Sequence, residues 1–305
     1  CTDANALNYD SSAMCDNGSC VFSDEVVSDL EEELSVFETV EDEQDYSMSF
    51  DGVDDHINCG DNIDLSNKSF SLSALVKKQN PDFTGASIIM STGNGTQNKG
   101  LYFGFDTHGS SDDYLFFNFF QPAGELYSEL PVTIENDNEW HHIVATYNFI
   151  SHERKIYLDG NLVGYDISSS PFLSSETEFS IGITSWNLVD DFNGNIKSAI
   201  VWDKELSIQE IQSHMTCSPS IEEEGLVGYW KFNEGSGDTV YDLSGNGNHG
   251  SINGAMFSED VPESYNGCTD VNALNFDESA LCDNGSCVYG DDLVASLEDE
   301  NSDLE

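Results

Sequence analysis

The chain has 305 residues and a formal net charge of −49 at pH 7, from 58 acidic and 9 basic residues. Nucleic acid is excluded as a partner because almost no Lys or Arg is present to neutralise phosphates, and an anionic membrane is disfavoured for the same reason. No stretch approaches the roughly 18 apolar residues that a membrane helix needs. Repulsion among the acids opposes compaction, so we expect cations to offset it, either as an adaptation to salty water or as specifically bound Ca²⁺.

The first 22 residues form a cysteine module that returns near the end of the chain. Residues 1–22 read CTDANALNYDSSAMCDNGSCVF, and residues 268–289 read CTDVNALNFDESALCDNGSCVY. A gap-free repeat this close predicts a modular array. A module of this size cannot bury a core and needs a staple or a metal, but it has no CxxC pair or Cys/His cluster of zinc spacing. We therefore predict disulfides and, with them, an extracellular or cell-surface location.

Three cysteines in each module leave one over. We favour the two bonds that close most of each module, Cys1–Cys20 and Cys268–Cys287. Cys15 and Cys282 are then free or bonded to a neighbour. Cys59 and Cys217 flank the large domain and are predicted to pair, although the spacing of the cysteines does not fix their connectivity.

The modules are also rich in the oxygen ligands that Ca²⁺ prefers. The expected ligands are Asp3, Asn8, Asp10 and Asp16 in the first copy and Asp270, Asn275, Asp277 and Asp283 in the second. The alternative is that these side chains form Asx-turns in a loop-rich module. The pattern resembles the short "GCTD…ALNYD…DGSC" repeats of secreted bacterial multidomain proteins, and this resemblance implies no assigned activity.

An acidic spacer follows each module, at residues 23–45 and 290–305. Four apolar residues of the first spacer fall at helical spacing, which permits a short amphipathic helix. The density of like charges favours instead a solvated, self-repelling segment.

Residues 46–262 predict one large all-β domain. Short segments that alternate apolar and polar residues, such as Phe70–Val76 and His142–Tyr147, predict strands, and Asp-Gly and Asn-Gly pairs predict turns between them. One helix is expected where Ser207 and Glu210 form a capping box. Many strands with such turns indicate a two-sheet jelly-roll β-sandwich with one short helix, flanked by the small disulfide-stapled modules.

Several motifs of this domain stand in an order that a known family shares. They are SFDGVDDHI at residues 49–57, WHHIVA at 140–145 followed by IYLDG at 156–160, and FNGNI at 192–196 followed by LSIQEI at 206–211. They resemble motifs of laminin-G-like, concanavalin A-like jelly rolls. Residues 225–237 and 242–250 match a strand and loop that come first in many relatives, so we expect a rearranged closure in which the last strand pairs beside the first. The resemblance implies a module that binds glycans, proteins or Ca²⁺.

Two oxygen-rich clusters of the large domain are candidate Ca²⁺ ligands. Asp51, Asp54 and Asp55 lie at one strand end. The second cluster lies in a Gly-rich loop and consists of Asp238, Asp242, Asn246 and Asn248. If the last strand pairs beside the first, the two clusters could share one ion. The alternative is that both segments only form turns.

The histidines and tryptophans are assigned mainly to structure. His141 and His142 begin a strand of the family motif, and Trp140, Trp202 and Trp230 are expected in the core. Trp186 is different, because it lies in a Gly/Ser/Asn-rich stretch. It is the candidate for an exposed ligand platform.

We predict no catalytic residues. Glycoside hydrolases share this fold and place paired acids around one cleft, and Glu135, Asp137 and Glu139 have a suitable alternate spacing. Asn136 and Asn138 between them are turn formers rather than strand residues. The sequence also lacks nucleophile-elbow, phosphate-loop and metalloprotease motifs.

These observations favour a calcium-dependent, extracellular binding or adhesion module of a repetitive surface protein, with a glycan or a surface protein as its ligand. The alternative is a structural repeat unit of a cell-surface fibre, which contacts neighbouring repeats or forms a homo-oligomeric filament. The third and weakest reading is a glycoside hydrolase.

Overall fold

The structure is a computed structural model, and it describes residues 44–79, 86–93, 99–106, 114–119, 125–127, 139–173, 178–184, 191–263, 266–283 and 286–289. The chain divides into two compact units, Cys1–Gln44 and Asp45–Glu305, and every element named below belongs to the second. The predictions for the first cysteine module, for nearly all of both spacers, for Glu135 and for Trp186 lie outside the described residues.

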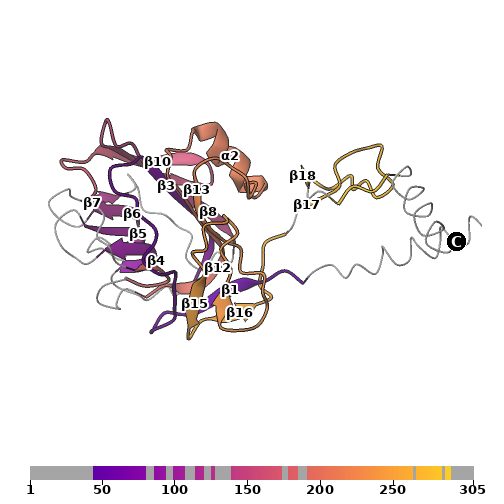
Figure 1. The fold of residues 1–305 in the computed structure, drawn as a ribbon, viewed down its shortest axis with the longest axis horizontal. Helices are drawn as coiled ribbons and strands as arrows, with labels where there is room; N and C mark the ends of the chain where they lie inside the picture. The colour runs from indigo at the N-terminus through magenta and orange to yellow at the C-terminus, as the bar shows by residue number, and fades with distance from the viewer. Residues whose placement is uncertain are drawn as a thin grey trace, which may run out of the picture. The chain divides into compact units, whose positions relative to one another are not determined.

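The first of two large sheets has eight strands, all paired antiparallel (Figure 1). Its path runs through β10 (Asn161–Ile167), β9 (Glu153–Leu158), β8 (His141–Tyr147), β3 (Phe70–Lys78), β12 (Asn193–Trp202), β1 (Ser47–Asp51) and β16 (Met256–Ser258), and β13 (Leu226–Trp230) also pairs with β12. Ser47 of β1 lies opposite Ser258 of β16. The last strand of the domain therefore pairs beside the first, as predicted, but that strand is β16. The strand at 225–237, from which the closure was predicted, is β13, and it pairs with β12 rather than with β1.

The second sheet also has eight antiparallel strands. Its path runs through β14 (Thr239–Val240), β15 (Gly250–Asn253), β2 (His56–Asn58), β11 (Phe179–Ile181), β4 (Ala86–Gly93), β5 (Gly100–Asp106), β6 (Tyr114–Phe119) and β7 (Glu125–Tyr127). A short parallel pair joins β17 (Asn266–Gly267), just before the second cysteine module, to β18 (Cys282–Asp283) within it. The prediction of a two-sheet jelly roll is confirmed.

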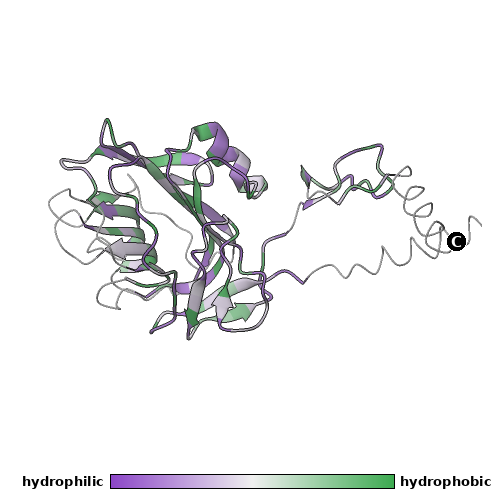
Figure 2. Cartoon of the chain, in the orientation of Figure 1, coloured by the Kyte–Doolittle hydropathy of each residue, from purple (hydrophilic) through white to green (hydrophobic). Residues whose placement is uncertain are grey.

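The core lies between the two sheets because side chains alternate along each strand. On β3, the core-facing residues Phe70, Leu72, Ala74 and Val76 are fully buried, and hydrophobic residues are interleaved with hydrophilic ones along the strands (Figure 2). Phe70 packs edge-on against Phe117 of β6, with ring centroids 6.1 Å apart. Burial of each such side chain contributes about 1.5–3 kcal/mol.

Arg154 of β9 ties the two sheets together inside this core. Its side chain is fully buried and donates to both carboxylate oxygens of Asp166 on β10, at 2.9 and 2.6 Å. The guanidinium group also donates to the carbonyl oxygen of Phe117 at 3.3 Å and lies 5.1 Å from the ring centre of Phe119. Both phenylalanines belong to β6, so Arg154 connects the edge of one sheet to the other.

The helix α2 (Ile208–Thr216) packs on the outer face of the first sheet. It begins with the predicted capping box, in which Ser207 accepts from the backbone of Glu210 and Glu210 accepts from that of Ser207. Ile211 is buried in a second cluster that includes Trp202 and Leu206. Among the described residues, no helix is long and apolar enough to span a membrane.

Candidate functional site

Three carboxylates meet at the turn between β1 and β2. Asp51 ends β1, and Asp54 and Asp55 precede β2. One oxygen from each lies within 4.8 Å of the others, and this is the only such group of three His, Cys, Asp or Glu side chains in the described part of the chain. Local hydrogen bonds shape the turn, because the Asp51 amide donates to Asp55 Oδ2 at 2.8 Å and the Val53 amide donates to Asp51 Oδ1 at 2.8 Å. Three like charges this close repel each other unless a cation or a proton intervenes.

Asp55 is the buried member of the group. Burial raises its pKa, and the nearby charges of Asp51 and Asp54 add to the effect. Gly254 lies directly against it at a φ of +81°, where an added Cβ would stand 2.1 Å from Asp55 Oδ1. The backbone therefore approaches this carboxylate at a point that only glycine allows. Clustered carboxylate oxygens of this kind suit a hard divalent cation such as Ca²⁺.

Side chains of the second predicted calcium cluster make hydrogen bonds within the fold. The buried Asp242 carboxylate accepts from the backbone amides of Tyr229, Ser244 and Asn248, at 3.0, 2.9 and 2.9 Å. The Asn246 side chain donates to the carbonyl oxygens at 226 and 227, and the Asn248 side chain donates to the latter at 2.9 Å. These bonds fasten the 242–248 loop to β13.

A calcium ion shared by the two clusters is ruled out by the strand register. Asp55 adjoins the end of β15 where Asn253 pairs with His56. Asp242 and Asn248 adjoin the other end, where Gly250 pairs with Val240. Asp242 and Asn248 thus lie at the opposite end of β15 from Asp55, and the prediction that the two clusters share one ion is wrong for them. Asp238 lies nearer the Asp55 end, where its carbonyl oxygen accepts from the Ile252 amide at 2.9 Å, but its carboxylate does not join the three-carboxylate group. Asp238 bonds to the neighbouring Thr239 hydroxyl at 3.1 Å.

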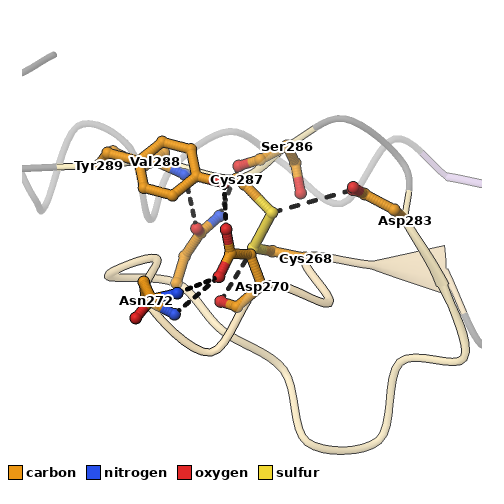
Figure 3. Close-up of a disulfide and its surroundings, with 9 residues drawn as sticks. Cys268, Asp270, Asn272, Asp283, Ser286, Cys287, Val288 and Tyr289 are labelled. Carbon is orange, nitrogen blue, oxygen red and sulfur yellow. Dashed lines mark hydrogen bonds between the residues drawn. A yellow bond between two sulfur atoms is a disulfide. The ribbon is translucent and has the colours of Figure 1, made fainter.

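In the second cysteine module, acidic side chains are held by local bonds (Figure 3). Asp270 accepts from the Asn272 amide at 2.9 Å and from the Tyr289 hydroxyl at 2.7 Å, and these bonds lower its pKa. Asp277 accepts from both the amide and the hydroxyl of Ser279, which lowers its pKa likewise.

Asn275 bridges two parts of this module. It accepts from the Val288 amide at 2.8 Å and donates to the carbonyl oxygen of Ser286 at 2.6 Å. Asp283 approaches the sulfur of Cys287 at 3.8 Å. The structure does not gather Asp270, Asp277 and Asp283 into one group, so for this copy it supports the Asx-turn alternative. The corresponding residues of the first copy lie outside the described residues.

The disulfides correct one prediction. The expected Cys268–Cys287 bond is present, but Cys217 pairs with Cys282. Cys59 is a free thiol, 1% exposed in the core between the sheets. Cys217 caps the end of α2 on the outer face of the first sheet, so a Cys59–Cys217 bond would have to cross that sheet.

A groove lined by Trp140 was not predicted. Two cavities of about 200 and 380 Å³ share Trp140, Pro262 and Glu263 in their walls. The indole Nε1 is buried and has no hydrogen-bond partner among the described residues. Lys77 and Asp260, which line the larger of the two cavities, form an ion pair at 3.0 Å. Trp140 was expected in the core, as Trp202 and Trp230 are, but it is only half-buried because it lies before β8 on the outer face.

His141 and His142 fix the start of β8. His141 Nδ1 lies 2.8 Å from Asp159 Oδ2, and the buried His142 ring lies 2.7 Å from the Ser73 hydroxyl. Burial lowers the pKa of His142 to about 4, with a further contribution from the nearby His214. The ring is therefore neutral near pH 7. Glu139 is exposed just before this strand.

With this geometry in place, comparison with known proteins identifies the family. Residues 51–212 match the family described as the concanavalin A-like lectin/glucanases superfamily. The chain belongs to this superfamily. A search of curated proteins found no match.

Two solved structures are similar to this chain. One is a candidate carbohydrate binding protein from Bacteroides ovatus, with a TM-score of 0.56 and 18% sequence identity over 70% of this chain. The present chain covers 59% of that protein's length. Another is a heptameric SAP-like pentraxin from Limulus polyphemus, with a TM-score of 0.47 and 12% identity, covering 71% of this chain and 96% of that one.

Proposed function

We propose that this chain is a non-enzymatic, calcium-dependent binding module of an extracellular surface or adhesion protein, and that its ligand is a glycan or a surface protein. The observation that carries the proposal is the three-carboxylate turn of Asp51, Asp54 and Asp55, in a chain whose net charge is −49 and whose superfamily is named for lectins and glucanases. The two disulfides support an oxidising, extracellular location.

The turn fits calcium in its donors. Its donors are carboxylate oxygens, which Ca²⁺ prefers. The Asp54 carboxylate is exposed and accepts no hydrogen bond from the described residues. A bound ion would neutralise the three charges, hold the β1–β2 turn, and offer its remaining coordination positions to ligand oxygens.

The groove beside Trp140 is the surface proposed for a sugar. Sugar rings combine apolar faces with hydroxyls at their edges, and binding sites match them with an aromatic surface and a few placed polar groups. Trp140 is only half-buried and offers part of its ring to this groove. Lys77, Asp260 and Glu263 surround it. The expected ligand segment is small, since the two cavities are about 200 and 380 Å³.

A glycan array tests the proposal. The chain is probed in millimolar CaCl₂ and in EDTA with NaCl adjusted to the same ionic strength. We expect reproducible binding in Ca²⁺ and loss of binding in EDTA. Trp140→Ala, which removes the aromatic surface of the groove, should weaken binding, whereas Tyr165→Ala, at an aromatic residue 59% exposed on β10, should not. Equal binding in EDTA would contradict the calcium requirement.

A structural repeat unit is the second candidate. The Cys217–Cys282 bond links the sandwich covalently to the module that follows it, as an array of domains under tension would require. A chain that folds normally in Ca²⁺ and binds neither arrayed glycans nor surface proteins would favour this second candidate.

A further inference from the structure

The Cys217–Cys282 disulfide joins two kinds of domain. Cys217 is the C-cap of α2, a helix of the sandwich, and Cys282 lies in β18 of the cysteine module, 65 residues later. The two sides also touch around the bond, because the Cys282 sulfur lies 3.1 Å from the carbonyl oxygen of Thr216 and the Cys217 sulfur lies 3.8 Å from that of Leu281. Cys217 and its neighbours Thr216 and Ser218 are at least partly exposed. The end of α2 is thus a surface that accepts the cysteine of a module.

Cys15 occupies the position of Cys282 in the first module. Residues 12–20 read SAMCDNGSC and residues 279–287 read SALCDNGSC, with one difference, Met14 for Leu281. The segment that touches the end of α2 in the second module is therefore almost unchanged in the first. A second copy of the segment calls for a second helix-end cysteine to bond.

None of the cysteines that the structure describes is a suitable partner for Cys15. Cys217 is bonded to Cys282, and Cys268 is bonded to Cys287. By the same repeat, Cys1 and Cys20 correspond to Cys268 and Cys287. Cys59 remains, but it is 1% exposed among the core side chains of the sandwich and another module could reach it only by opening the two sheets.

We propose that the cysteine module docks on the end of the helix of a laminin-G-like sandwich and forms a disulfide there. In this proposal, Cys15 bonds to the residue equivalent to Cys217 in another copy of that sandwich. The bond forms when the two thiols lose two protons and two electrons to a small-molecule disulfide, which is reduced to two thiols. Each sandwich would then be fastened to the module after it, and successive units would form a covalently linked series. This proposal does not depend on calcium or on a glycan ligand.

Mixed-disulfide mapping tests the proposal with full-length chains. Wild-type chain, with Cys15 available, is incubated in a glutathione redox buffer with an isotope-labelled Cys15→Ser/Cys282→Ser chain, whose Cys217 is free. The matched control is a Cys15→Ser/Cys217→Ser chain, which exposes one thiol on the module side of the same junction. Peptide mapping after alkylation quantifies each bond.

We expect the yield of the Cys15–Cys217 bond between chains to be about ten times the yield of the Cys15–Cys282 bond with the control chain. It should also be about ten times the yield of the Cys15–Cys15 bond between wild-type chains. Equal yields for the three bonds would overturn the proposal, because they would show encounter without docking. A second measurement needs no variant. Native wild-type chain treated with iodoacetamide should be labelled at Cys15, and finding Cys15 bonded to Cys1 or Cys20 instead would also overturn the proposal.

Discussion

Calcium should stabilise this protein through Asp54 in particular. Asp54 is the informative position because its carboxylate is exposed and accepts no hydrogen bond from the described residues. Asp51 and Asp55, by contrast, accept bonds that shape the turn, so replacing them would alter the backbone as well as the charge. Asp54→Asn removes one charge and keeps the size of the side chain.

Asp54→Asn should change the stability of the chain in opposite directions without and with Ca²⁺. Without Ca²⁺, two unit charges about 4 Å apart in water repel by about 1 kcal/mol, so Asp54→Asn should be neutral or slightly stabilising. With free Ca²⁺ at 100 times Kd, the wild-type chain should gain about 2.7 kcal/mol. A site weakened 100-fold would gain only about 0.4 kcal/mol at the same concentration. For a domain of about 200 residues, 2.7 kcal/mol corresponds to a rise in Tm of roughly 5–10 °C.

Thermal melting at fixed ionic strength measures the effect of Asp54→Asn on stability with and without Ca²⁺. The two chains are melted in EDTA with NaCl, in CaCl₂ and in MgCl₂, with NaCl adjusted to match. Mg²⁺ should stabilise less, because it gives up its waters reluctantly and demands a tighter octahedron. Asp61→Asn is the matched control, since it removes one exposed charge outside the three-carboxylate group. If all three salts give the same curve, or if Asp61→Asn loses as much calcium response as Asp54→Asn, the assigned site is wrong and the charge is only a salt adaptation.

Three further predictions follow from buried groups. Asp166→Ala, which leaves the buried Arg154 without its carboxylate partner, should cost about 1.5–3 kcal/mol in urea unfolding, and a loss below 0.5 kcal/mol would contradict this tie between strands. Because burial lowers the pKa of His142 to about 4 in the folded chain, the stability it contributes should be complete above pH 6.5 and should fall as the pH drops from 6.5 to 4, where the unfolded chain takes up a proton and the folded chain does not. His142→Gln should remove about 3 kcal/mol of that pH dependence. Parallel profiles of stability against pH for the wild-type and variant chains would refute this prediction. Thiol titration of the denatured, unreduced chain should find two thiols, Cys15 and Cys59, of which Cys59 should be unreactive in the native chain because burial raises its pKa well above the usual value; six or more thiols would exclude the disulfide framework.

Features that depend on neighbouring residues in the sequence were predictable. The capping box of α2 needs only Ser207 and Glu210, three residues apart, and the structure forms both of its bonds. The meeting of Asp51, Asp54 and Asp55 likewise follows from a five-residue turn. Alternation along β3 identified the core-facing residues, since the period of a strand is fixed by the backbone.

Features that depend on distant packing were not predictable. Asp242 has the composition of a metal ligand, but its carboxylate accepts the Tyr229 amide from a strand 13 residues away, and only the tertiary fold decides between the two roles. Trp140 has a hydrophobic side chain in a strand motif, but the shape of its surroundings is set by residues near Asp260, more than a hundred positions later. The pairing of Cys217 with Cys282 depends on how a module docks on a helix, which no local pattern specifies.

The distribution of the nine basic residues bears on what the module can bind. All of them lie between residues 68 and 231, within the sandwich, and at least six form ion pairs with carboxylates of the same chain. Lys197 is an example, because it is 6% exposed and bonds to Asp45 at 2.6 Å and to two carbonyl oxygens. Basic groups held in this way connect strands and loops rather than bind an anion.

A ligand carrying sulfate or carboxylate groups would be repelled by the net charge of −49 on this chain, which has only nine basic residues to pair with it. We therefore expect the ligand to be a neutral glycan, or a protein surface with basic residues, and we expect Ca²⁺ rather than lysine to supply the positive charge at the binding face.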